Sequence, residues 1–153
     1  MGEPIEHKLI ARLAGALDGA TATALTGEMV RLGSTQAVLE LLDELQEASP
    51  KAAQGAIEAL PELHHRCGLA EIVSWLDLGV ALAGSSGAAA LKYFKGSPLL
   101  LGSVESVPSR RQVMTLAMDL AENDPQHPNV ALDFLRKAPE LLAVLPGDRK
   151  SVV

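Results

Sequence analysis

The segment 64–67 of this 153-residue chain, with the sequence HHRC, combines residue types that bind metal ions. His64 and Cys67 are three residues apart, so in a helix their side chains share a face. An imidazole and a thiolate together suit zinc or another thiophilic metal. Two ligands do not close a site, however, and the other two histidines are distant in sequence. A metal or small-ligand sensor that uses His64, His65 and Cys67 is therefore the alternative hypothesis.

The preferred interpretation of the same segment is a helix end. His and Arg side chains favour the negative pole of the helix dipole. Cys67 would be a small apolar residue there, and Gly68 would be the C-cap. We therefore expect no metal and no cofactor.

Other catalytic patterns are missing from the sequence. No Gly-x-Ser-x-Gly elbow is present, and the single cysteine has no independent reason to be a thiolate. The segment 84–87, GSSG, lacks the spacing and the Lys-Ser/Thr pair of a phosphate-binding loop. Adjacent acids such as Asp43 and Glu44 fall on the polar face of a predicted helix, where solvated charges are usual. We expect a protein that is not an enzyme.

Composition points to helices and away from two classes of partner. Hydrophobic residues make up 48% of the chain but aromatic residues only 3%, which favours helix over sheet. The net charge of −6 opposes binding to nucleic acid. No apolar run reaches the roughly 18 residues that a membrane-spanning helix needs. The acidic N-terminal segment is unlike a signal peptide, so we expect a cytoplasmic protein.

Helical periodicity is clearest from Ser34 to Ala48, where apolar and acidic residues take opposite faces. Ser34 is predicted to cap this helix, Ser49 to end it, and Pro50 to begin the next. Similar reasoning predicts further helices at 4–17, 21–32, 51–60, 69–83, 87–95, 108–122 and 129–137, and no strand.

The predicted helix 69–83 is apolar on most sides, so we expect it to pack on more than one side. Gly79 in its interior costs about 1 kcal/mol relative to alanine, which suggests that another helix approaches closely there. Trp75 is expected to be a core residue; the alternative is an anchor in a binding interface.

A pattern recurs at intervals of 37 and 41 residues, marked by Pro61, Pro98 and Pro139. Each proline is predicted to end a short helix that carries small residues and a bulky apolar one. Those bulky residues are Ile57, Phe94 and Phe134, and each short helix follows a longer apolar helix. The predicted unit is a long helix, a turn, a short helix and a proline.

A hairpin of this size cannot bury its own apolar face, and periods near 40 residues are typical of helical solenoids. We predict an all-α fold, a right-handed HEAT-like α-solenoid of about three to four stacked hairpins in one domain, 1–153. A cap would occupy 1–33, and the repeats would occupy about 34–68, 69–105 and 106–147. The alternative is an irregular helical bundle in which the prolines recur by chance.

The stretch from Trp75 to Leu101, which includes WLDLG, Tyr93-Phe94 and Ser97-Pro98, carries a resemblance. It resembles the helical repeats ahead of the von Willebrand factor A domain in bacterial proteins of the nitric-oxide-reductase-activation and CoxE-like families. This resemblance implies a bacterial adaptor that works with a MoxR-type AAA+ ATPase. The Asp-x-Ser-x-Ser metal motif of the von Willebrand domain is absent, so metal-dependent adhesion does not carry over. The chain is either the repeat module alone or similar only to HEAT-type repeats in general.

The expected function is therefore protein binding, as a scaffold or adaptor. The predicted contact surface is the concave side of the solenoid, with acidic residues from successive long helices. These candidates are Glu40, Glu44, Asp77 and Asp119. An acidic surface would attract a basic partner, either another protein or the AAA+ ATPase.

Overall fold

The computed structural model describes residues 4–104 and 107–144, with the backbone alone at 107 and 139–144. All regular elements in these residues are helices, so the all-α prediction is confirmed. The helices are α1 (Ile5–Leu13), α2 (Gly19–Leu32), α3 (Thr35–Ala48), α4 (Pro50–Cys67), α5 (Ile72–Ser85), α6 (Gly87–Gly102), α7 (Val107–Asn123) and α8 (Pro128–Val144).

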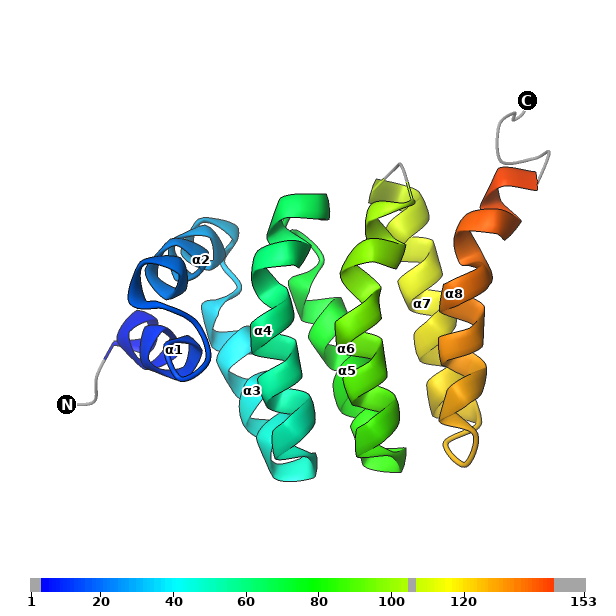
Figure 1. Cartoon of the computed structure of the whole chain (residues 1–153), viewed down its shortest axis with the longest axis horizontal. Helices are drawn as coiled ribbons and strands as arrows, with labels where there is room; N and C mark the ends of the chain where they lie inside the picture. Colours follow the sequence, from blue (N-terminus) through cyan, green and yellow to red (C-terminus); the bar gives the residue numbers. More distant parts are fainter. Residues whose placement is uncertain (1–3, 105–106, 145–153) are drawn as a thin grey trace.

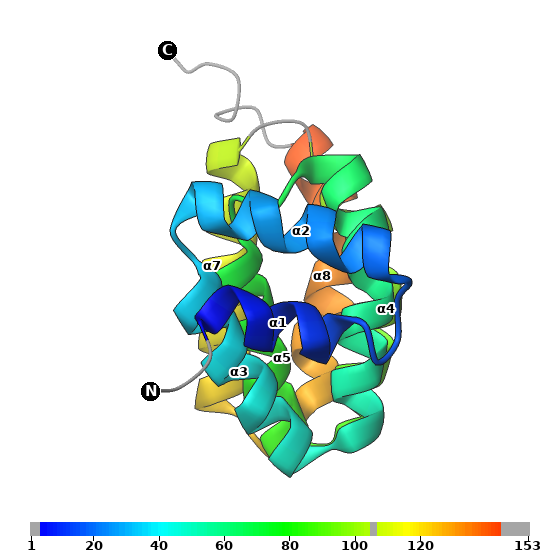
Figure 2. The ribbon, with the colours of Figure 1, turned by 90° about the vertical axis from the view of Figure 1, so that its left-hand side faces the viewer.

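The helices form hairpins that lie side by side along the long axis of the molecule (Figure 1). Helices α3, α5 and α7 pack in sequence against one another, and we call them the odd layer. Helices α4, α6 and α8 do the same and form the even layer. Figure 2 shows the two layers edge on, with α1 and α2 running across their end. The hairpins α3–α4, α5–α6 and α7–α8 fall within the three predicted repeat segments, of which residues 105–106 and 145–147 lie outside the described chain.

The prediction that the repeated prolines end short helices is wrong. Pro61 lies inside α4 and Pro98 inside α6, and α8 continues through position 139 to Val144. Each proline is the twelfth residue of its helix, because the three helices begin at Pro50, Gly87 and Pro128. The helix starts therefore recur at the same intervals as the prolines.

The common position of the proline in the three helices also shows that one residue of the predicted pattern is wrong. A small residue eight positions before the proline and a bulky one four positions before it are buried in each even-layer helix. These pairs are Ala53 with Ile57, Ala90 with Phe94, and Ala131 with Leu135. In α8 the bulky core residue is thus Leu135, at 2% exposure, whereas the predicted Phe134 is only partly buried.

Three aromatic residues join α5 to α6. Trp75 is 1% exposed, which confirms its assignment to the core. Its indole Nε1 donates a hydrogen bond to Ser97 Oγ at 2.6 Å, and Tyr93 Oη donates one to the Trp75 carbonyl at 2.8 Å. The Phe94 ring meets Trp75 edge to face, with ring centroids 4.8 Å apart. Burial of the indole N–H and the phenol O–H is compatible with stability because both donors have partners.

Gly79 permits this junction, as the sequence predicts. A Cβ at Gly79 would lie 2.0 Å from Cζ of Phe94, well inside ordinary carbon–carbon contact. Only a residue without a side chain lets α5 approach α6 this closely.

The start of α4 and the glycine at its end follow the sequence signals, whereas the predicted cap of α3 does not. Ser49 caps α4, Pro50 is its first residue, and Gly68 ends it at a positive φ of 77°. Ser34 was expected to cap α3, but its side chain makes no capping hydrogen bond. Its hydroxyl and its N–H both point back to the Met29 carbonyl, and thus complete the end of α2 instead.

Candidate functional site

The four acidic residues singled out in the sequence lie in the odd layer. Glu40 and Glu44 are on α3, Asp77 is on α5 and Asp119 is on α7, and all four side chains are exposed. Helix α3 is flanked by α1 and α5 and packs against α4, while α5 is flanked by α3 and α7 and packs against α6. Exposed side chains in the middle of these helices therefore point away from the even layer. The structure places the candidates on one outer surface.

Asp119 belongs to a stripe on α7 that borders α5. Arg111, Thr115 and Asp119 are spaced i, i+4 and i+8, so they share a helix face. Arg111 Nε contacts Glu71 Oε2, just before α5, at 2.9 Å. The ion pair fixes which side of α7 faces α5.

A hollow of about 330 Å³ lies between α5 and α7 on this surface. Its lining includes the Glu71–Arg111 pair together with Val73, Ser74 and Thr115. Val73 is 36% exposed, although the apolar pattern of its helix predicted packing on more than one side. Sequence reasoning missed Val73 as a surface residue, because a valine among leucines and isoleucines carries no signal of exposure. The surface thus combines carboxylates with an exposed aliphatic group.

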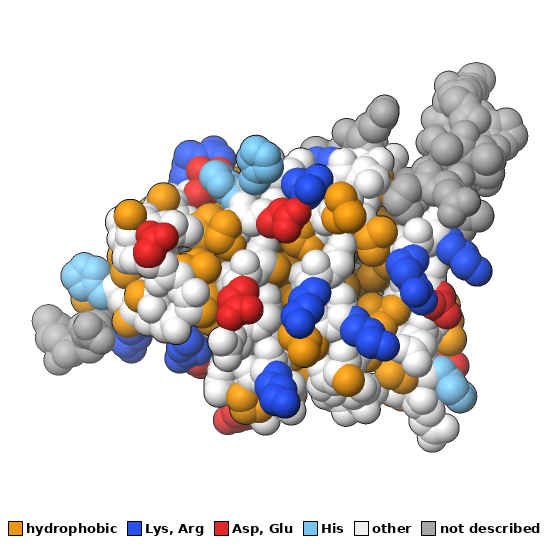
Figure 3. Space-filling view, viewed as in Figure 1, with side chains coloured by type: hydrophobic (Ala, Val, Ile, Leu, Met, Phe, Trp, Pro, Cys, Tyr) orange, Lys and Arg blue, Asp and Glu red, His pale blue; other side chains and the backbone are white. Residues whose placement is uncertain are grey.

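The two layers differ in charge. In the odd layer, the described helices carry seven carboxylates and only two arginines, and α3 has four carboxylates with no basic residue. In the even layer, the described side chains include six lysines and arginines against three carboxylates. Figure 3 shows the face of the even layer, where Lys and Arg side chains gather over α6 and α8. The outer surface of the odd layer can therefore attract a positively charged partner.

The segment 64–67 does not converge with other ligands. His64 and His65 are exposed, and Cys67 is half-buried at the end of α4. Burial raises the pKa of the Cys67 thiol; the Arg110 guanidinium opposes this shift and the Glu71 carboxylate adds to it. The thiolate, which is the form that binds zinc, is therefore disfavoured. Among the described side chains, those of residues 4–104 and 108–138, no group of three or more His, Cys, Asp or Glu is placed to hold a metal ion.

The two adjacent arginines of α7, Arg110 and Arg111, both make contacts within the chain. Arg110 Nη1 donates to the Val104 carbonyl at 2.8 Å, and Arg111 pairs with Glu71. Two more adjacent basic pairs occur in the sequence: Arg136 and Lys137 lie on α8, and residues 149–150 lie outside the described residues.

No helix of the described chain has the length and apolar character needed to cross a membrane. Searches of protein-family models, of curated proteins and of solved structures return no match.

Proposed function

We propose that the chain is a non-enzymatic helical-repeat module that binds another protein through the outer surface of its odd layer. The fold we propose is a short right-handed α-solenoid of the HEAT-like kind, with α1–α2 as a cap. Three stacked hairpins whose second helices share one proline register support this proposal. Each hairpin covers the apolar face of the next, as repeat modules do.

The acidic odd layer is the observation that carries the binding proposal. Glu40, Glu44, Asp77 and Asp119 come from three helices that the fold sets side by side. None of these four carboxylates has an ion-pair partner among the described residues. Such charges contribute little to the fold, so they are free to attract a partner. The partner we propose has a basic surface, and the resemblance around Trp75–Leu101 makes an AAA+ ATPase the first candidate.

Charge reversal tests this function. The immobilised protein is compared with the double variant Glu40→Lys, Asp77→Lys in capture from cell lysate, followed by titration of the purified captured protein by calorimetry. The matched control is Glu6→Lys, Glu58→Lys, which makes the same charge change at exposed positions on α1 and α4.

We expect a stoichiometric partner that the wild type and the control retain and the odd-layer variant loses. A partner retained equally by all three proteins would remove the odd layer from the binding site. Turnover of a small molecule by the purified chain would contradict a non-enzymatic role.

A further inference from the structure

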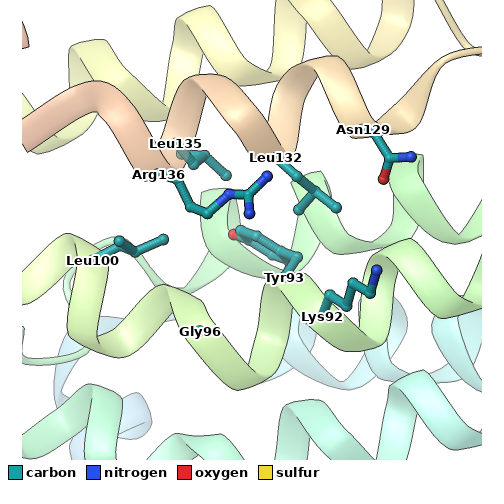
Figure 4. Close-up of a pocket in the computed structure, with 8 residues that line it drawn as sticks. All are labelled: Lys92, Tyr93, Gly96, Leu100, Asn129, Leu132, Leu135 and Arg136. Atoms are coloured by element: carbon teal, nitrogen blue, oxygen red, sulfur yellow. The ribbon is translucent and has the colours of Figure 1, made fainter.

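A second surface lies on the opposite side of the molecule, in a groove between α6 and α8. Helix α6 contributes Lys92, Gly96 and Leu100, spaced i, i+4 and i+8. Helix α8 contributes Asn129, Leu132, Leu135 and Arg136, and Tyr93 completes the lining. Figure 4 shows the two stripes facing each other, with Lys92 and Arg136 on either side of the Tyr93 ring.

The groove has an apolar floor of limited size. Leu135 and Tyr93 are buried, and Leu100 and Leu132 are half-buried. Its volume is about 160 Å³, whereas pockets for whole small molecules run from roughly 300 to 1,000 Å³. Eight residues of helix span about 12 Å, which matches about four residues of extended chain. The dimensions favour a short peptide segment with one or two aliphatic side chains.

The two charged residues that line the groove, Lys92 and Arg136, are both positive. Helix α6 has two lysines, Lys92 and Lys95, and no carboxylate. Neither lysine has an ion-pair partner among the described residues. Arg136 Nη2 contacts Asp133 Oδ1 one turn earlier on α8, which leaves other guanidinium N–H groups to donate. The groove therefore offers cations without neutralising acids on its α6 side.

We propose that the α6–α8 groove binds an acidic peptide segment of a partner protein. An aliphatic side chain of the peptide lies on the floor formed by Leu132 and Leu135, and its carboxylates contact Lys92 and Arg136. A nucleic acid would supply negative charge but no aliphatic side chain for the floor formed by Leu132 and Leu135. This site differs from the odd-layer surface in its position and in the charge of its partner, which is negative here and positive there.

The test is fluorescence anisotropy with a short fluorescein-labelled peptide in which two leucines are flanked by glutamates. Lys92→Glu and Arg136→Glu reverse the two charges that define the site. Gly96→Leu fills the groove, and it is compatible with folding because a Cβ at Gly96 meets nothing within 4 Å. The control Lys8→Glu makes the same charge change at an exposed position on α1. Far-UV circular dichroism checks that each variant is folded.

We expect saturable binding that each of the three groove variants weakens roughly tenfold and that Lys8→Glu leaves unchanged. Each charge reversal turns an attraction into a repulsion of similar size, and Gly96→Leu fills the space that the aliphatic side chain of the peptide would occupy. A peptide with glutamines in place of glutamates should bind more weakly and lose most of the dependence on salt.

Several results would overturn the proposal: no saturable binding at low salt, equal loss in Lys8→Glu, or equal affinity for the glutamine peptide or for a single-stranded oligonucleotide. A dimer in solution that excludes the peptide would make a second copy of the chain the occupant instead. These measurements use an acidic probe and even-layer variants, so their failure leaves the odd-layer proposal standing, and the reverse also holds.

Discussion

The close approach of α5 and α6 at Gly79 gives the most stringent test of the packing. Gly79→Ala adds one methyl group, which would lie 2.0 Å from Cζ and 2.6 Å from Cε2 of Phe94. Carbon atoms in contact prefer about 3.5 Å or more, so the ring must withdraw by about 1.5 Å. It has no room to do so, because Trp75 and Tyr93 pack around it with ring centroids 4.8 and 5.0 Å away.

Two opposing effects set the magnitude. Alanine is the better helix former by about 1 kcal/mol. Overpacking a core costs about 1–3 kcal/mol, and the rigid surroundings of Phe94 place this case at the upper end. We therefore expect Gly79→Ala to lower the free energy of unfolding by about 2 kcal/mol, which corresponds to a fall in Tm of roughly 4–8 °C for a chain of this size.

Urea unfolding followed by circular dichroism measures the change, with Gly27→Ala in α2 as the matched control. A Cβ at Gly27 meets nothing within 4 Å, so that variant should gain up to about 1 kcal/mol. The double variant Gly79→Ala, Phe94→Leu should recover part of the loss, because the smaller side chain frees space. A Gly79→Ala protein as stable as the Gly27→Ala protein would refute the close approach of α5 and α6.

Three further changes probe the same junction and the helix ends. Ser97→Ala should cost about 1–3 kcal/mol in urea unfolding, because it leaves the buried Trp75 N–H without an acceptor. Burial raises the pKa of Tyr93 well above its ordinary value, and Asp77 and Cys67 add to the shift. Below pH 10 the folded and the unfolded protein both keep the phenol proton, whereas above pH 10 only the unfolded protein loses it. The free energy of unfolding should therefore fall by about 1.4 kcal/mol for each pH unit above 10 in the wild type relative to Tyr93→Phe, measured by urea titrations at several pH values. Ser86→Ala should cost about 1 kcal/mol because Ser86 caps α6, whereas Ser34→Ala should cost less; equal losses in the two serine variants would contradict the cap assignments.

Sequence periodicity predicts most of the helices because most of them have one buried and one solvated face. The predicted helices at 21–32 and 108–122 match α2 and α7 within two residues at each end. The predicted end at Pro61 fails because local propensity competes with packing. A proline inside a helix costs about 3 kcal/mol, but Leu63, beyond the proline, is 2% exposed and contributes to the core only if α4 continues. Such tertiary compensation has no local sequence signal.

Ser34 illustrates a second limit of local reasoning. Its sequence context suits an N-cap, but the same residue follows Gly33, which ends α2 in the left-handed region with φ 71°. The Ser34 N–H then donates to the Met29 carbonyl at 3.0 Å, the hydrogen bond that follows such a glycine at a helix end. Ser34 could complete the end of α2 or cap the start of α3, and the local sequence does not show which of the two it does.

Of the two candidate surfaces, the sequence predicts the exposed acidic positions of the odd layer but not the groove between α6 and α8. Exposure of Glu40, Glu44, Asp77 and Asp119 follows from helical periodicity, and the prediction of polar positions succeeds there. The α6–α8 groove joins residues about 40 positions apart, such as Lys92 and Arg136, so only the stacking of hairpins brings them together. Helices of the acidic layer and of the basic layer alternate along the chain, because successive helices belong to different layers. A stretch of sequence that spans two helices therefore mixes the charges of the two layers, and the opposite charges of the layers cannot be seen in the sequence.

The opposite charges of the two layers have a consequence for binding. The outer surfaces are separated by two helices, each about 10 Å across, so they lie about 20 Å apart. The Debye length at physiological ionic strength is about 8 Å. A charge bound on one surface is thus largely screened from the other, and the acidic peptide should change the affinity of the odd layer for its basic partner by less than about twofold. Titration of the partner with and without saturating peptide measures this, and a tenfold change at physiological salt would mean that the helices themselves shift when either surface is occupied.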